Sequence, residues 1–336
     1  MDGSNSEDNG IQPSCGWPSS PEHPMSTSIS AGFAPPHAVA LLVVYCLVYV
    51  IPLYFSAATR PSPTRSRDAP EAIRARIFVV SLSTAICSLV TLYLLSSHAA
   101  IAIPNPLHFM GYWPVGLVDA ARALWLTALL FAGPLYESLI VDGAARQWLH
   151  LQPLRDLWTD WPTWRNMVAP AFSVSILIYR KGPITEECLF RSAGVPLLLR
   201  SGASLTGTIF LSPLIFGLAH LHHFYEFRIT HPHTPLPVAI LRSLFQLTYT
   251  TLFGAYATFL FLRTGSLLAV VLIHAFCNCM GLPRFWGQVD PYWLAEDDPA
   301  RKRYTAVYYV LLVAGLVAWL QNLYSLTETP MALAEF

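Results

Sequence analysis

The segment Gly182-Pro183-Ile184-Thr185-Glu186-Glu187-Cys188-Leu189-Phe190-Arg191 places two adjacent carboxylates and an arginine within an otherwise apolar part of the chain. Pro183 is typical of the first turn of a helix, where its missing N–H leaves no hydrogen bond unmade. Both glutamates then lie near a helix N-terminus, whose dipole favours anions. On this helix Glu187 and Arg191 are four residues apart and face each other, while Glu186 points about 100° away. The segment therefore predicts one paired and one unpaired glutamate.

The unpaired carboxylate of Glu186 has two interpretations. In a dry, partly buried site it is suited to act as a general base on water. The simpler interpretation is that both glutamates cap a helix and that Glu187 also bridges to Arg191, which is the more usual arrangement in soluble proteins. The rest of the chain decides between the two.

The composition is that of a polytopic membrane protein. Of the 336 residues, 54% are hydrophobic and 12% are charged, whereas charged residues make up about a quarter of a typical soluble protein. The formal net charge is zero and no basic tract with interleaved aromatic residues occurs, which excludes a nucleic-acid-binding protein. The six cysteines lie mostly in apolar segments, which argues against disulfides. The pair Cys277 and Cys279 has no second cysteine pair to complete a thiolate metal site.

Hydropathy divides the chain into eight expected spans, each about long enough to cross ~30 Å of hydrocarbon. They cover residues 38–58, 77–96, 116–141, 183–199, 205–221, 238–262, 266–282 and 304–324. We expect residues 1–37 to form a disordered tail, because they are rich in Ser, Pro and Gly and contain no Lys or Arg. Residues 38–324 form the expected membrane domain and residues 325–336 a short C-terminal tail. The expected fold class is all-α, a polytopic membrane helix bundle of about eight transmembrane helices.

The positions of the basic residues predict the orientation of these spans. If the N-terminal tail is lumenal, 15 of the 20 Lys and Arg residues fall in cytosolic loops: Arg60, Arg65, Arg67, Arg74, Arg76, Arg146, Arg155, Arg165, Arg180, Lys181, Arg228, Arg284, Arg301, Lys302 and Arg303. Because cytosolic loops carry an excess of Lys and Arg, this bias favours eight spans with both termini in the lumen.

Polar residues recur in two further apolar segments, Phe216-Gly217-Leu218-Ala219-His220 and His274-Ala275-Phe276-Cys277-Asn278. His274 and Asn278 share one helical face at i and i+4. In the orientation above, these residues and Glu186 all lie in the cytosolic half of the bilayer. Because ionisable groups are costly in lipid, we expect them to face one shared, wet intramembrane cavity.

The chemistry that fits this group is hydrolysis by an activated water. Glu186 and His220 would share the deprotonation of that water, and His274 and Asn278 would donate hydrogen bonds to the oxyanion. Thr185, Cys188 and Ser192 are close enough in sequence to act as nucleophiles instead of water, but none of them shows a local sign of activation. A zinc ion held by two histidines and a glutamate is the stronger alternative mechanism. The spacing of these residues in the sequence does not decide between the two mechanisms.

Histidines also gather between the fifth and sixth spans, where we expect a His-rich loop over residues 221–237. The side chains in question are those of His222, His223, His231 and His233. We interpret them as lining a solvated loop, with a weak metal or pH role as the alternative.

At these residues the sequence resembles the type II CAAX prenyl endopeptidases, eukaryotic members of the ABI/CPBP group of glutamate intramembrane proteases. The resemblance rests on EExxxR at Glu186 to Arg191, FxxxH at Phe216 to His220 and HxxxN at His274 to Asn278, in that order. It covers a motif core of about residues 164–282, and the flanking spans only in hydropathy.

The resemblance implies an enzyme of the endoplasmic reticulum membrane, with its active site facing the cytosolic leaflet. It would remove the last three residues from farnesylated or geranylgeranylated CaaX proteins, such as Ras-type GTPases, without a metal or other cofactor. By the same resemblance, Glu186 and His220 activate water, and His274 and Asn278 form the oxyanion hole. Glu187, Arg191 and Phe216 support the site.

One departure from the family pattern lies just before the first motif. In the family an Arg-Asn pair lies a few residues before the Pro-x-x-Glu-Glu start, whereas here Arg165 and Asn166 are separated from it by a candidate insert at residues 170–181. We hypothesise that the insert derives from a retained intron in the gene model. Transcripts that keep the segment in every copy would exclude this origin.

Two other functions fit a polar cluster in a membrane bundle. In a non-catalytic scaffold of the same fold the cluster would only hold helices together, and in a proton-coupled transporter the acids and histidines would relay protons. A transporter predicts polar residues in both leaflets, and the lumenal halves of the expected spans have few.

Overall fold

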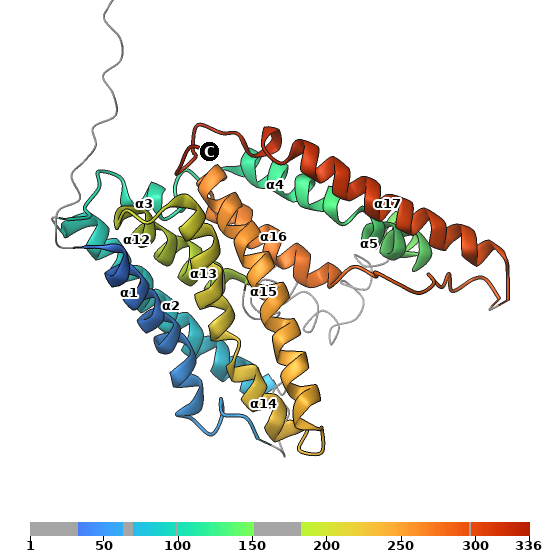
Figure 1. Cartoon of the computed structure of the whole chain (residues 1–336), viewed down its shortest axis with the longest axis horizontal. Coiled ribbons are helices and arrows are strands. Elements are labelled where there is room, and N and C mark those ends of the chain that lie inside the picture. Colours follow the sequence, from blue (N-terminus) through green and yellow to red (C-terminus); the bar gives the residue numbers. More distant parts are fainter. Residues whose placement is uncertain (1–32, 63–69, 99, 151–182, 296) are drawn as a thin grey trace, which may run out of the picture.

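The computed structural model describes residues 33–62, 70–98, 100–150, 183–295 and 297–336. Within these residues the regular structure is entirely helical, so the predicted all-α class is confirmed (Figure 1). Residues 1–32 of the expected tail and the candidate insert at 170–181 lie outside the described residues. The first helix begins at Pro35, three residues before the expected boundary at residue 38.

The N-terminal part of the bundle consists of two long helices. Helix α1 (Pro35–Val50) continues into a short 3₁₀ helix, η1 (Ile51–Tyr54), and α2 (Pro70–Ser97) returns beside it. Many large apolar side chains of α2 are exposed, among them Phe78, Leu82, Leu89 and Tyr93. An apolar surface of this extent is typical of a helix that faces lipid.

The expected span at 116–141 is broken into pieces. After the short α3 (Pro106–Phe109), the chain forms α4 (Leu117–Leu130), α5 (Ala132–Tyr136) and the π-helical η2 (Glu137–Val141), followed by α6 (Ala144–Leu149). The parts before and after Phe131 meet at 84°, so the helical segment at the expected span is sharply bent. Pro134 has no N–H to donate to the carbonyl four residues earlier, which favours a break at this point.

The motif segment is the short helix α11 (Pro183–Glu187), followed by the π-helical η4 (Cys188–Ala193) and by α12 (Gly194–Arg200). Pro196 cannot donate to the Ser192 carbonyl, which helps to explain why the helix widens here. The segment contacts α1, α2, α13 and α16. It therefore lies inside the bundle, where the polar side chains of the motif can meet other helices.

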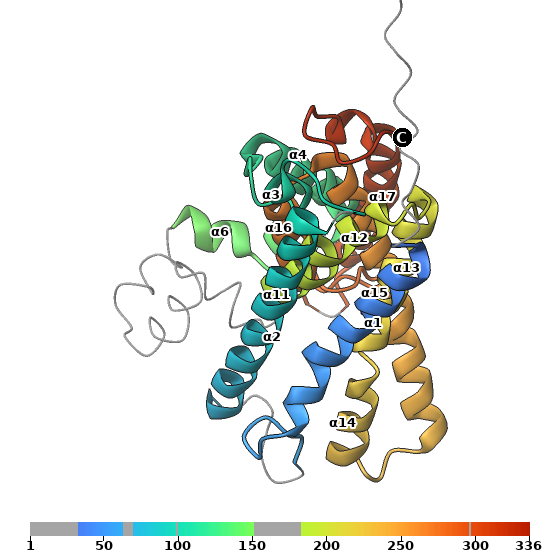
Figure 2. The ribbon, with the colours of Figure 1, turned by 90° about the vertical axis from the view of Figure 1, so that its left-hand side faces the viewer.

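The C-terminal half contributes the remaining helices of the bundle. They are α13 (Leu205–Ala219), α14 (His222–Thr230), α15 (Leu236–Thr264), α16 (Leu267–Met280) and α17 (Ala300–Asn322). Helices α13 and α15 pack side by side, with α1 lying against α13 (Figure 2). Helix α17 lies along α4 and α5 (Figure 1), and the chain ends after a short 3₁₀ helix, η5 (Ser325–Thr327).

Each of the eight expected spans coincides with a helical segment, and the polytopic helical bundle is confirmed. In the described residues, four helices are long and apolar enough to cross a membrane: Pro35–Tyr54, Glu71–Ser97, Leu205–Thr230 and Ala300–Asn322. The bent pair α4 and α5–η2 makes a fifth if it is one span, and Leu267–Met280 is a shorter apolar helix. Fewer than eight of the described helices are therefore long and apolar enough to cross a membrane individually.

The expected His-rich loop at 221–237 is largely helical. Residues His222–Thr230 form α14, which extends α13 after a break at His220 and Leu221. His222 and His223 are partly buried rather than solvated. The prediction failed for His222 and His223 because polar side chains of α14 find partners within the bundle, as Glu226 does with Arg76 of α2 at 2.7 Å. His231 and His233 are exposed in the turn after α14, as predicted.

Candidate active site

The predicted pairing of Glu187 with Arg191 is present at the centre of the motif segment. Nη1 of Arg191 donates to Oε1 of Glu187 at 3.0 Å, and both side chains are completely buried. Nη2 of Arg191 donates to the Gly254 carbonyl of α15 at 3.2 Å, and the guanidinium lies over the Phe216 ring at 4.8 Å. A buried charge pair needs such additional contacts to offset its loss of hydration.

His274 of α16 lies between the two motif glutamates. Its Nδ1 is 2.6 Å from Oε1 of Glu187, and its Nε2 is 3.8 Å from Oε2 of Glu186. Glu186 is therefore not left unpaired, as we predicted from helical spacing alone, but has a loose charge contact with His274. The side chain of Glu186 is 17% exposed and that of Glu187 is 0% exposed, so water can reach only the first of the two.

His220 stands at the C-terminal end of α13. Its Nδ1 is 2.9 Å from the Phe216 carbonyl one turn earlier. A ring nitrogen that contacts a carbonyl oxygen acts as the donor, so Nε2 is left to accept a proton. The ring of Phe216 lies 4.7 Å from that of His220 and 6.5 Å from that of His274, so Phe216 neighbours both histidines. The His220 ring interacts electrostatically with Glu186.

Asn278 is the remaining predicted site residue. It follows His274 by four residues on α16, and its side chain is exposed. The structure thus brings Glu186, Glu187, Arg191, Phe216, His220 and His274 together through contacts, and relates Asn278 to them through its position on the same helical face.

Sequence reasoning missed three residues that shape the site. The Phe253 ring lies 4.6 Å from that of His274, and the next residue, Gly254, supplies the carbonyl that accepts from Arg191. The hydroxyl of Tyr49 is 3.2 Å from Oγ1 of Thr185, just before the glutamates. A glycine within a long apolar helix is itself a signal of close helix packing, and Gly254 is such a residue.

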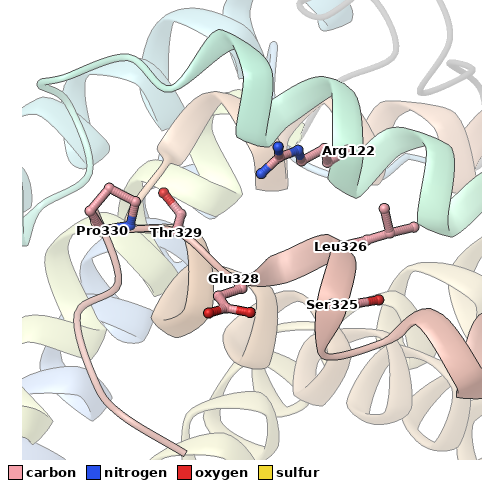
Figure 3. A pocket seen from close by; sticks show the side chains of 6 residues that line it. All are labelled: Arg122, Ser325, Leu326, Glu328, Thr329 and Pro330. Carbon is pink, nitrogen blue, oxygen red and sulfur yellow. The ribbon is translucent and has the colours of Figure 1, made fainter.

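A cavity of about 630 Å³ lies at a different place in the bundle (Figure 3). Arg122 of α4 faces the C-terminal segment there, and the other lining residues are Ser325, Leu326, Glu328, Thr329 and Pro330. None of the residues predicted for catalysis lines this cavity. It is therefore not the intramembrane catalytic cavity that we expected.

One group of side chains in the described residues is close enough to hold a metal ion. It consists of His222, His223 and Glu226 on α14. This group differs from the zinc set of Glu186, His220 and His274 that the sequence left open.

The arrangement around His274 is suited to hydrolysis. A partly exposed carboxylate and an imidazole can take a proton from water, and a second imidazole, fixed by a buried carboxylate, can donate a hydrogen bond. The aromatic rings of Phe216 and Phe253 border these polar groups. The low dielectric of such surroundings strengthens electrostatic interactions in the site.

Comparisons with known proteins find relatives that are named as prenyl proteases. A sequence model of the family described as type II CAAX prenyl endopeptidase, Rce1-like, matches residues 167–280. The chain is 34% identical to a probable CAAX prenyl protease 2 of Schizosaccharomyces pombe, covering 81% of this chain and 88% of the relative. It is 34% identical to CAAX prenyl protease 2 of Arabidopsis thaliana, covering 73% and 80%, and 33% identical to that of Homo sapiens, covering 79% and 78%. No solved structure matches the chain significantly.

Proposed function

Because this chain belongs to the family of Rce1-like type II CAAX prenyl endopeptidases, we propose that it removes the C-terminal aaX tripeptide from prenylated CaaX proteins. The observation that carries the proposal is the meeting of α11, α13 and α16 at one polar cluster, with His274 between Glu186 and Glu187. All three family motifs lie on these helices, and each contributes a side chain to the cluster.

The proposed reaction uses water as the nucleophile. Glu186, assisted by His220, takes a proton from the water as its oxygen attacks the carbonyl carbon of the scissile peptide bond. The C–N bond of the tetrahedral intermediate then breaks, and the proton passes to the leaving nitrogen, which becomes the amino terminus of the released tripeptide. The prenylated cysteine keeps the new carboxylate. No covalent enzyme intermediate forms, so Thr185, Cys188 and Ser192 need no activation.

His274 and Asn278 are the proposed donors to the oxyanion. Since Nδ1 of His274 faces the Glu187 carboxylate, it must carry hydrogen, and Nε2 can also donate only in the imidazolium form. The ring lies between the carboxylates of Glu186 and Glu187, and Glu187 is shared with Arg191, so both ring nitrogens face acceptors to which N–H groups can donate. Glu187 therefore positions His274 and favours its protonated form, while Arg191 holds the Glu187 carboxylate in place.

The membrane setting fits a lipid-modified substrate. A prenyl group is held by apolar surroundings, and a protein anchored in this way reaches its protease within the bilayer. We place the protein in the endoplasmic reticulum membrane with the site in the cytosolic leaflet, on the basis of the family resemblance and of the Lys and Arg distribution. Prenylated Ras-type GTPases are the proposed substrates, because they approach the bilayer from the cytosol.

Tripeptide release tests this function directly. Membranes from cells that express the chain are mixed with a farnesylated CaaX peptide, and products are identified by mass spectrometry. We expect the aaX tripeptide and the shortened prenyl peptide, and no cleavage of the same peptide without its farnesyl group. A chain that inserts into the membrane and leaves both farnesylated and geranylgeranylated peptides intact would overturn the proposal and favour a non-catalytic scaffold.

A further inference from the structure

The first turns of α14 carry three potential metal ligands that the proposed hydrolysis does not use. His222, His223 and Glu226 each offer one ligand atom, and these atoms all lie within 4.8 Å of one another. Glu226 is buried and the two histidines are partly buried. Two imidazoles and a carboxylate form a donor set that zinc commonly takes in proteins.

The backbone fixes the orientation of the His222 ring. Its Nδ1 lies 2.6 Å from the Ala219 carbonyl, so Nδ1 is the donor and Nε2 carries the free lone pair. Metal-binding histidines are typically held in this way, with the second ring nitrogen donating to a carbonyl or a carboxylate. The His222 ring is thus in the tautomer that a metal requires, and its centroid lies 4.0 Å from that of His223.

The carboxylate of Glu226 is held by groups on two sides. Its Oε1 accepts from Nη2 of Arg76 at 2.7 Å, and Nε of Arg76 donates to the Thr59 carbonyl at 3.0 Å. Its Oε2 is 3.0 Å from Nδ1 of His223. One carboxylate oxygen is therefore fixed by arginine while the other faces the histidines, which is the arrangement of a ligand oriented by an outer partner.

We propose that His222, His223 and Glu226 bind a divalent transition-metal ion, with zinc as the best fit. Tetrahedral zinc with bonds of about 2.0–2.1 Å separates its ligands by about 3.3 Å. In the metal-free protein the 3.0 Å contact between His223 Nδ1 and Glu226 Oε2 is a hydrogen bond, and an ion held by these two atoms would take the place of its proton. The predominance of imidazole ligands favours zinc over magnesium or calcium, which prefer oxygen.

The site has a structural consequence that is separate from the proposed hydrolysis. The His223 ring lies 5.7 Å from that of His220, and Glu226 ties α14 to Arg76 of α2. A bound ion would cross-link two turns of α14 and fix the end of α13 where His220 stands. Metal binding would therefore raise the thermal stability of the protein whether or not it cleaves prenyl peptides.

Metal titration of the purified full-length protein tests the proposal. Zn²⁺ alone is titrated into metal-free protein in lipid nanodiscs by calorimetry, and Co²⁺ provides an absorption spectrum of the coordination sphere. We expect one ion per chain, a Co²⁺ spectrum without sulfur charge-transfer bands, and a rise in Tm on metal addition. The spectrum excludes binding by Cys277 and Cys279.

Variants locate the ion. His222→Ala leaves the Glu226 and Arg76 pair intact and is expected to weaken Zn²⁺ binding at least tenfold, while His233→Ala, an exposed histidine beyond the same helix, leaves it unchanged. The double variant Glu186→Gln and His274→Ala is expected to retain the ion. Absence of zinc binding, binding that survives His222→Ala and His223→Ala together, or loss of binding in the Glu186 and His274 double variant would each overturn the proposal.

Discussion

Nδ1 of His274 lies 2.6 Å from Oε1 of Glu187, so α16 is joined to the motif segment by a buried hydrogen bond. The same carboxylate oxygen accepts from Nη1 of Arg191 at 3.0 Å. Glu187 thereby contacts both Arg191 and His274. This contact orients Nε2 of His274 toward Glu186. Adjacent glutamates consequently have different tasks: Glu187 fixes the histidine, and Glu186 remains accessible to water.

Replacing Glu187 tests whether it positions His274. Glu187→Gln removes the charge that holds the imidazolium, and we expect kcat for tripeptide release to fall by roughly 10²-fold or more, as happens when the carboxylate that orients a catalytic histidine is neutralised. The exposed Glu328 provides the control, and Glu328→Gln is expected to leave kcat unchanged. A Glu187→Gln protein with wild-type kcat would show that this carboxylate does not act through His274.

Asn278 tests the oxyanion hole. Loss of one such donor lowers kcat by about 10²–10³-fold in other hydrolases, and we expect the same range for Asn278→Ala with KM nearly unchanged. Because the side chain is exposed, folding is expected to be retained. Cys279→Ala, at the exposed neighbouring position, is the matched control. Equal kcat values for the two variants would remove Asn278 from the site.

The helix contact at Gly254 tests how the site is supported. A Cβ at this position would lie 2.8 Å from Cβ of Pro213 and 3.0 Å from Nη2 of Arg191, so Gly254→Ala must displace α13 or the arginine. Overpacking of this kind usually destabilises by about 1–3 kcal/mol. At Gly194, also helical and buried, the nearest atoms would lie at 3.4 Å, and Gly194→Ala is expected to be tolerated. The comparison requires the Tm and the cleavage rate of both variants, and equal values would contradict the predicted crowding.

A chelator separates the proposed water mechanism from a zinc hydrolase. In the His222→Ala and His223→Ala double variant, which lacks the proposed α14 metal site, we expect 1,10-phenanthroline to leave the rate of tripeptide release unchanged, whatever that rate is. Loss of the remaining activity, with recovery on adding Zn²⁺, would instead indicate an ion held by Glu186, His220 and His274.

Sequence periodicity predicts contacts within one helix far better than contacts between helices. The pairing of Glu187 with Arg191 follows from their spacing of four residues, and it is present in the structure. The contact of Glu187 with His274 joins residues 87 positions apart, and it depends on how α11 packs against α16. Helical spacing therefore left Glu186 unpaired in the prediction, although the packing places His274 beside it.

Two features of the fold that the sequence analysis did not predict have local causes. The bend at Phe131 follows from Pro134, whose effect is hidden in a hydropathy profile because the residues on both sides are apolar. The helix α14 was taken for a loop because its histidines and Glu226 are polar, yet Arg76 and His223 satisfy the buried carboxylate. The polar residues of α14 thus indicate partners within the bundle rather than solvent.

The central claim is that the carboxylate of Glu186 activates the water that cleaves the prenylated substrate. The most direct measurement is the rate of tripeptide release from a farnesylated CaaX peptide by purified Glu186→Gln protein in nanodiscs, beside the wild type at equal concentration. The variant keeps the size of the side chain and lacks the base, so we predict a rate lower by roughly 10²–10⁴-fold with unchanged Tm. A Glu186→Gln protein that releases the tripeptide at the wild-type rate would contradict the account.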